Sequence, residues 1–120
     1  MSVALAVLSG ARTAVGVGGW LAPRTSWQAF GLGECPADLP SAVVVNRLFA
    51  VRDLAFGLGL RHPDPAVRRA VLQAGIAIDA VDVVASAVGV RRGAPRASLL
   101  GVTAGAALFV VLGAVALGEE

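Results

Sequence analysis

Six ionisable side chains lie within otherwise apolar segments. They are arginines and aspartates, which can form ion pairs or share a proton away from bulk water. An arginine guanidinium stays charged when desolvated and donates five N–H groups, which suits it to bind carboxylates. Asp79 and Asp82, three residues apart, nearly superpose on one helix face, and adjacent like charges favour a shared proton. The six residues are Arg12, Arg47, Arg52, Asp53, Asp79 and Asp82.

Buried charges of this kind must find partners if the chain lies in a membrane. Each one at the centre of a membrane helix costs about 2.5–3.5 kcal/mol, or about 15–20 kcal/mol for all six. Three are positive and three negative, so pairing at a common depth is expected. One interpretation is a structural ion-pair network, in which Arg12 and Arg52 neutralise the three aspartates and Arg47 is an outer member. The other is a polar cavity that binds a proton, an ion or a small polar ligand.

Helical periodicity directs these residues toward a shared interior. Positions three or four apart fall on one helix face, and polar or small residues form such a stripe in four segments. The stripes are Ser9, Arg12, Gly16 and Gly19; Asn46, Ala50, Asp53 and Gly57; Gly75, Asp79, Asp82 and Ser86; and Gly101, Gly105, Phe109 and Gly113. Small residues let helix backbones approach closely in lipid. The glycines assigned to helix packing are Gly16, Gly57, Gly101 and Gly105.

Four segments have the length needed to cross a bilayer, whose core of about 30 Å requires about 20 helical residues. They are residues 2–22, 41–60, 70–90 and 98–118. Asp64-Pro65 is typical of an N-cap followed by the first helical residue, and Gly93-Ala94-Pro95 also interrupts the apolar pattern. Short turns at these places make neighbouring helices antiparallel. The sequence therefore predicts an all-α, four-helix transmembrane bundle with up-down-up-down order.

The composition supports a single membrane domain over residues 1–120. Hydrophobic residues make up 57% and charged residues 15% of the chain. A soluble domain carries about 25% charged residues, so water is the wrong solvent for most of this sequence. The longer connection, residues 23–40, contains Trp27 and Phe30 and is predicted to be an interfacial loop or short helix.

Several functional classes are excluded or disfavoured. All ten basic residues are arginines in short clusters without a polybasic arm, so no nucleic-acid partner is expected. Cys35 and His62 are the only residues of their types, and no metal set, cofactor motif or nucleophile–base pair is recognisable. Hence no catalytic residue, no metal and no cofactor is predicted.

A run of motifs resembles an uncharacterised family of small bacterial four-helix membrane proteins. The matching elements include Leu21-Ala22-Pro23-Arg24, Arg52-Asp53-Leu54-Ala55-Phe56-Gly57-Leu58-Gly59 and Asp79-x-x-Asp82. The resemblance covers about residues 9–90. It implies a location in the bacterial inner (plasma) membrane and adds no activity.

Two functions follow from these observations. The first is a structural or accessory membrane component, whose partners are the lipid bilayer and either further copies of the chain or another membrane subunit. The second is a small transporter or proton-linked carrier built on Asp79, Asp82, Arg52 and Arg12.

Overall fold

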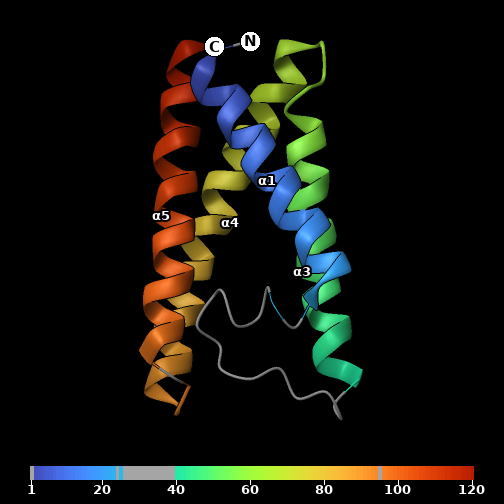
Figure 1. Ribbon diagram of the computed structural model, residues 1–120. Helices are drawn as coiled ribbons and strands as arrows, with labels where there is room; N and C mark the ends of the chain where they lie inside the picture. The colour runs from blue at the N-terminus through green and yellow to red at the C-terminus, as the bar shows by residue number, and fades with distance from the viewer. Residues whose placement is uncertain (1, 24, 26–39, 95) are drawn as a thin grey trace.

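The computed structural model describes residues 2–23, 25, 40–94 and 96–120. Over these ranges the chain forms four long helices and no strand: α1 (Val3–Leu21), α3 (Pro40–Gly59), α4 (Pro65–Arg91) and α5 (Arg96–Glu119). The helices run alternately down and up, so α1 begins and α5 ends at the same end of the bundle (Figure 1). The predicted all-α, four-helix fold with up-down-up-down order is confirmed.

Three helices are long and apolar enough to cross a membrane: Val3–Leu21, Pro65–Arg91 and Leu100–Glu119. Helix α3 has 20 residues, which is also a spanning length, but it carries three charged residues near its middle. Two of them, Arg52 and Asp53, bind side chains of other helices. The apolar surface of the other helices and this internal pairing together fit a membrane environment.

Local sequence fixes the helix ends. The Asp64 side chain accepts a hydrogen bond from the Ala66 amide, and Pro65 occupies the first helical position, so α4 starts five residues before the predicted span. After α4, Gly93 adopts a φ of 105°, which a residue with a side chain rarely adopts. The Ala94 amide then donates to the Gly89 carbonyl at 2.9 Å and closes the last turn.

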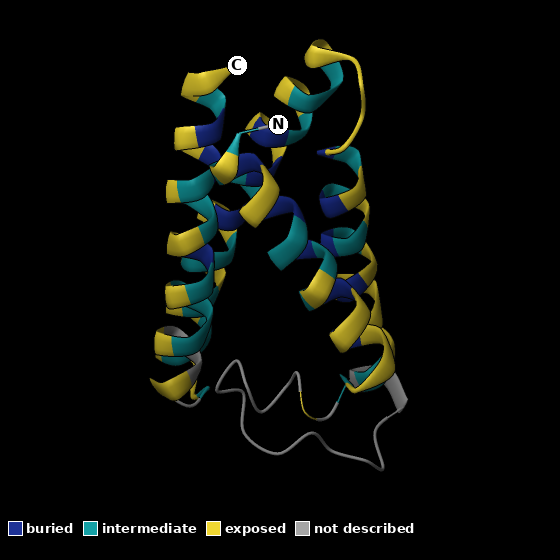
Figure 2. Cartoon of the chain, turned by 45° about the horizontal axis from the view of Figure 1, so that its top comes forward, coloured by how far each residue is buried: buried dark blue, intermediate teal, exposed yellow. Residues whose placement is uncertain are grey.

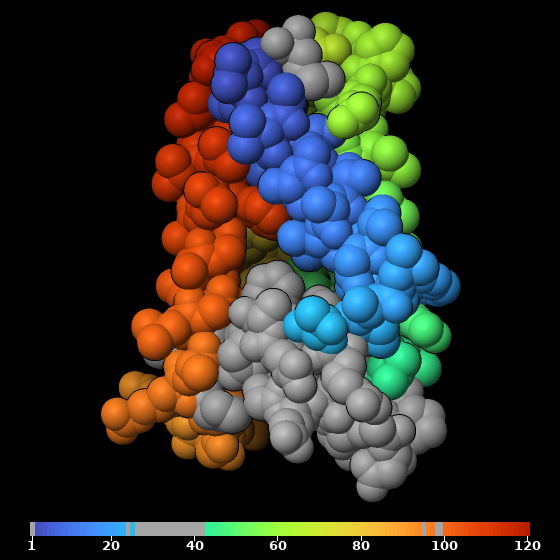
Figure 3. All heavy atoms as spheres, in the orientation of Figure 1, coloured from blue at the N-terminus to red at the C-terminus, as the bar shows by residue number. Residues whose placement is uncertain are grey.

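The four helices form two closely packed pairs. Helix α1 packs most extensively against α3, and α4 against α5. Helix α1 lies diagonally across one face, beginning beside α5 and ending beside α3 (Figure 3). We call these units the α1–α3 pair and the α4–α5 pair. They diverge with distance from the end that holds the chain termini (Figures 1 and 2).

The apolar core lies near the end where the two pairs meet. Its buried members come from α1, α4, α5 and the turn that follows α3: Leu5, Leu8, Leu60, Leu72 and Ala116. The buried positions continue along the inner face of α1 to Ser9, Arg12 and Gly16 (Figure 2). The bundle therefore has an apolar end and, beyond it, a polar middle. The interfacial loop or helix predicted over 23–40 lies almost entirely outside the described residues.

Candidate functional site

The polar middle of the bundle is organised around Arg12. This residue is at the centre of α1 and is only 2% exposed. Its Nη1 donates to Oδ1 of Asp53 at 2.8 Å and to Oδ1 of Asp79 at 3.5 Å, and its Nη2 donates to Oδ2 of Asp79. One guanidinium thus binds two carboxylates, one from α3 and one from α4.

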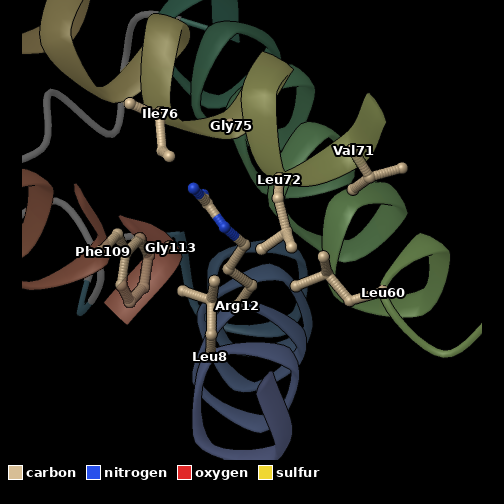
Figure 4. Close-up of a pocket in the computed structure, with 9 residues that line it drawn as sticks. All are labelled: Leu8, Arg12, Leu60, Val71, Leu72, Gly75, Ile76, Phe109 and Gly113. Atoms are coloured by element: carbon tan, nitrogen blue, oxygen red, sulfur yellow. The ribbon is translucent and has the colours of Figure 1, made fainter. Parts of the chain in front are cut away.

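Aromatic rings and a glycine shape the space that the Arg12 side chain occupies. The Cζ atom of Arg12 lies 4.6 Å from the centre of the Phe109 ring and 5.3 Å from that of Phe56. A Cβ atom on Gly75 would lie only 2.9 Å from Nη2 of Arg12, so a side chain at this position would force the guanidinium to shift. Arg12 extends between Phe109 and Leu72 toward α4 (Figure 4). Cation–π contacts of this kind stabilise a desolvated guanidinium.

The apolar side of Arg12 is tightly packed. The space between Arg12 and its apolar neighbours is too narrow for a water molecule. It is lined by Leu8, Leu60, Val71, Leu72, Gly75, Ile76, Phe109 and Gly113 (Figure 4). A dry site strengthens electrostatic attraction, and it makes any charge without a partner costly.

A second ion pair lies closer to the bundle surface. The Nη2 atom of Arg52 donates to Oδ2 of Asp82 at 2.9 Å, and Nη1 lies 3.4 Å from Oδ1. The side chains are 26% and 16% exposed, so this pair is less enclosed than that of Arg12. The Phe49 ring centre lies 3.7 Å from Cζ of Arg52. The Nε atom of Arg52 is buried and has no hydrogen-bond partner within the part of the chain that the structure describes.

These ion pairs connect the two halves of the bundle. The bonds from Arg12 to Asp79 and from Arg52 to Asp82 cross from the α1–α3 pair to the α4–α5 pair. Because the pairs diverge beyond the apolar core, the charged contacts hold them together in the middle of the bundle (Figure 1).

Within the α1–α3 pair, the predicted glycines allow very close packing. A Cβ atom on Gly16 would lie 2.6 Å from the Leu54 amide nitrogen, and one on Gly57 would lie 2.8 Å from the Thr13 amide nitrogen. The Ser9 hydroxyl uses this closeness to donate to the Gly57 carbonyl at 2.7 Å. These contacts fix the rotation of α1 that directs Arg12 inward.

The packing role predicted for Gly101 and Gly105 of α5 stays a prediction. Gly101 and Gly105 are half-buried. A close approach of α5 to α4 occurs at Gly113, where a Cβ atom would lie 3.0 Å from Cγ1 of Ile76. Gly113 belongs to the same stripe as Gly101 and Gly105, and it is buried on the side of α5 that faces α4.

Two expectations about the charged residues need correction. Arg47 is not part of the network: it is exposed, its Nε donates to the Trp20 carbonyl at 3.3 Å, and its guanidinium lies over the Trp20 ring. At about 100° per residue, six positions place Arg47 about 120° away from Asp53 around the helix axis. Asp79 and Asp82, expected to act together, bind different arginines.

One polar contact was not anticipated from the sequence. Arg61, assigned to a head-group-anchoring turn, donates from Nε to the Ser9 hydroxyl at 3.0 Å. Ser9 is fully buried and lies one helical turn before Arg12. No spacing rule could find this contact, because it depends on how the turn folds back over α1.

A separate polar cavity of about 470 Å³ opens at the end of the bundle that holds the termini. Arg68 spans it, donating from Nε to the Glu120 carboxylate at 3.0 Å and from Nη1 to the His62 carbonyl. The hydrogen bond from Arg68 holds the pKa of the Glu120 carboxyl below its ordinary value. The cavity is lined by Ser2, Leu5, Arg61, His62, Pro63, Pro65, Arg68, Glu119 and Glu120.

Within the described ranges, no three His, Cys, Asp or Glu side chains gather in a way that could hold a metal ion. No protein-family model, curated protein or solved structure matches this chain.

Proposed function

We propose that this chain is a structural or accessory component of a membrane, and that its buried arginine–aspartate network holds the bundle together. One observation carries the proposal: Arg12 is only 2% exposed, binds both Asp53 and Asp79, and has no room for a water molecule on its apolar side. A transport site must admit its substrate. A closed, dry ion pair instead suits a permanent contact between helices.

The proposed location is the bacterial inner membrane, in a multi-pass arrangement. This location rests on the resemblance to the family of small bacterial four-helix membrane proteins and on the apolar outer surfaces of the helices. Exposed branched side chains such as Val44, Val45 and Leu48 on α3, and Leu108 and Val111 on α5, suit contact with lipid or with another membrane helix. The partners proposed are the bilayer itself and a second copy or another membrane subunit.

The test compares folding with flux. The purified chain is reconstituted into vesicles of phosphatidylethanolamine and phosphatidylglycerol, and the decay of an imposed pH gradient is followed. We expect wild-type vesicles to lose the gradient no faster than vesicles without protein. Native mass spectrometry of the same preparation measures whether the chain assembles with itself.

A proton-linked carrier is the second candidate, and the Arg52–Asp82 pair favours it. That pair is partly exposed, and the Nε atom of Arg52 has no partner among the described residues, so this end of the network is not saturated. If wild type accelerates the decay of the gradient, and a folded Asp82→Asn variant does not, the carrier replaces the structural role.

A further inference from the structure

The buried charges do not balance. Arg47 lies outside the bundle interior, so among the described residues two guanidiniums face three carboxylates. Asp82 has Arg52 as its own partner, whereas Asp53 and Asp79 both depend on Arg12. If all these groups were ionised, the interior would carry one uncompensated negative charge, which is very unfavourable in a dry, apolar setting.

The two carboxylates that depend on Arg12 meet at one of its nitrogen atoms, Nη1. Oδ1 of Asp53 and Oδ1 of Asp79 both accept from Nη1 of Arg12, so the two carboxylates are neighbours. Two carboxylates that share a site do not both ionise readily, and they hold one proton between them. Phe109, which α5 places against the guanidinium, offers a ring and no charge.

Five charged groups face this site from the described helices. Helix α1 contributes Arg12, α3 contributes Arg52 and Asp53, and α4 contributes Asp79 and Asp82. Arg61 is one further cation near this region, but it binds Ser9 beside the apolar core and is exposed. Its charge is therefore largely compensated by water.

We propose that Asp53 and Asp79, bridged by Arg12, form a proton-binding site that holds one proton at neutral pH. The proton comes from the aqueous phase and protonates one carboxylate, which becomes a neutral carboxylic acid. A metal cation does not fit this role, because the Arg12 guanidinium already occupies the position between the two carboxylates and binds both. This inference rests on the buried network described above, and it holds whether the chain is an accessory component or a carrier.

Proton release on unfolding tests the site directly. In water an aspartic acid ionises with a pKa of about 3.9, so an Asp53–Asp79 proton must leave when sodium dodecyl sulfate unfolds the chain at neutral pH. A pH indicator in weakly buffered solution should report about one proton released per wild-type chain. The Asp53→Asn variant leaves Arg12 with one carboxylate, so it should release none.

A matched control and a second measurement complete the test. Asp64→Asn removes an exposed carboxylate that caps α4, and asparagine also caps helices, so this variant should release the same proton as wild type. Infrared spectra of the folded protein should show a carboxylic acid C=O band that Asp53→Asn and Asp79→Asn lack. Wild type that releases no proton and shows no such band would overturn the proposal. So would release that persists undiminished in both Asp53→Asn and Asp79→Asn. Neither result depends on the pH-gradient assay, so the proton site and the structural role can fail separately.

Discussion

Gly75 lets the Arg12 guanidinium lie against α4: a Cβ atom at position 75 would be only 2.9 Å from Nη2 of Arg12. This relationship explains how α4 can approach an arginine of α1 and still present Asp79 to it one helical turn later. The packing of the bundle and the pairing of its charges thus depend on each other.

The first prediction concerns this position. Gly75→Ala should lower the free energy of unfolding by about 1–3 kcal/mol, because the new methyl group displaces a guanidinium that two carboxylates hold in place. Gly18→Ala is the matched control, since a Cβ there meets nothing within 4 Å and alanine favours a helix. Unfolding in sodium dodecyl sulfate, followed by circular dichroism, measures both. Equal stability of the two variants would contradict the role of Gly75.

The second prediction concerns the close contact of α1 with α3. Gly16→Ala places a methyl group against backbone atoms of Ala50 and Leu54, which cannot rotate away. We expect a loss of about 1–3 kcal/mol or more in the same unfolding assay. Gly10→Ala on the same helix, with open space around its Cβ, should be as stable as wild type. A wild-type result for Gly16→Ala would mean that the helices lie farther apart.

The third prediction separates the buried arginine from the exposed one. Arg12→Gln leaves Asp53 and Asp79 without a cation, and breaking a buried pair in this way costs about 3–5 kcal/mol. Arg47→Gln removes an exposed contact with Trp20 and should change stability by less than about 0.5 kcal/mol. If both variants unfolded at the same detergent concentration, burial would not distinguish the two arginines.

The fourth prediction is non-additivity between Asp53 and Asp79. Either single substitution to asparagine leaves Arg12 with one carboxylate and should cost little, because the amide resembles the neutral acid that it replaces. The double variant strands a buried guanidinium and should lose about 3–5 kcal/mol. A double-mutant cycle of unfolding free energies measures the coupling. Costs that simply add would show that the two carboxylates do not share Arg12.

The fifth prediction is the pH dependence of the fold. Since the native state holds a proton that the unfolded chain has lost at neutral pH, wild-type stability should fall as the pH rises through the range where the bound proton leaves. Asp53→Asn should be flat over that range. A wild-type curve that rises or stays level there would contradict the prediction.

The Arg68–Glu120 pair responds in the opposite direction. In the folded protein the Glu120 carboxyl has a lowered pKa. The pair therefore stabilises the fold at a pH above the pKa of Glu120 in the unfolded chain, and this stabilisation is lost as the pH falls through the pKa of Glu120 in the folded protein. The two effects therefore occur in different pH windows. Glu120→Gln should abolish only the loss of stability at acidic pH. Because the Arg68–Glu120 pair is exposed, this change in stability should be small.

Much of the fold was predictable because its signals are local. Each signal is a short run of consecutive residues: the apolar segments of spanning length, the Asp64-Pro65 start of α4 and the glycine after its end. The depth of the charges was predictable for the same reason: Arg12 lies near the middle of α1 and Asp79 near the middle of α4. Their similar depth and their positions on the polar faces of their helices indicated that Arg12 and Asp79 would meet.

The choice of partners was not predictable, because it depends on how each helix is tilted and rotated. The diagonal course of α1 brings Arg12 to Asp79 and leaves Asp82 to Arg52. Arg47 has the right charge and a plausible depth, yet it points away from the interior toward Trp20. The contact of Arg61 with Ser9 likewise depends on tertiary packing that spacing does not encode.

The most direct measurement is the dipolar coupling between the Arg12 guanidinium nitrogens and the side-chain carboxyl carbons of Asp53 and Asp79. It can be recorded by solid-state NMR on labelled protein in lipid bilayers. Loss of each signal in Asp53→Asn or Asp79→Asn assigns it. Both couplings should be detectable, because Nη1 of Arg12 donates to Oδ1 of Asp53 at 2.8 Å and Nη2 donates to Oδ2 of Asp79. Absence of the Asp79 coupling in folded protein, with the carboxylate facing lipid, would contradict a bundle joined at Arg12.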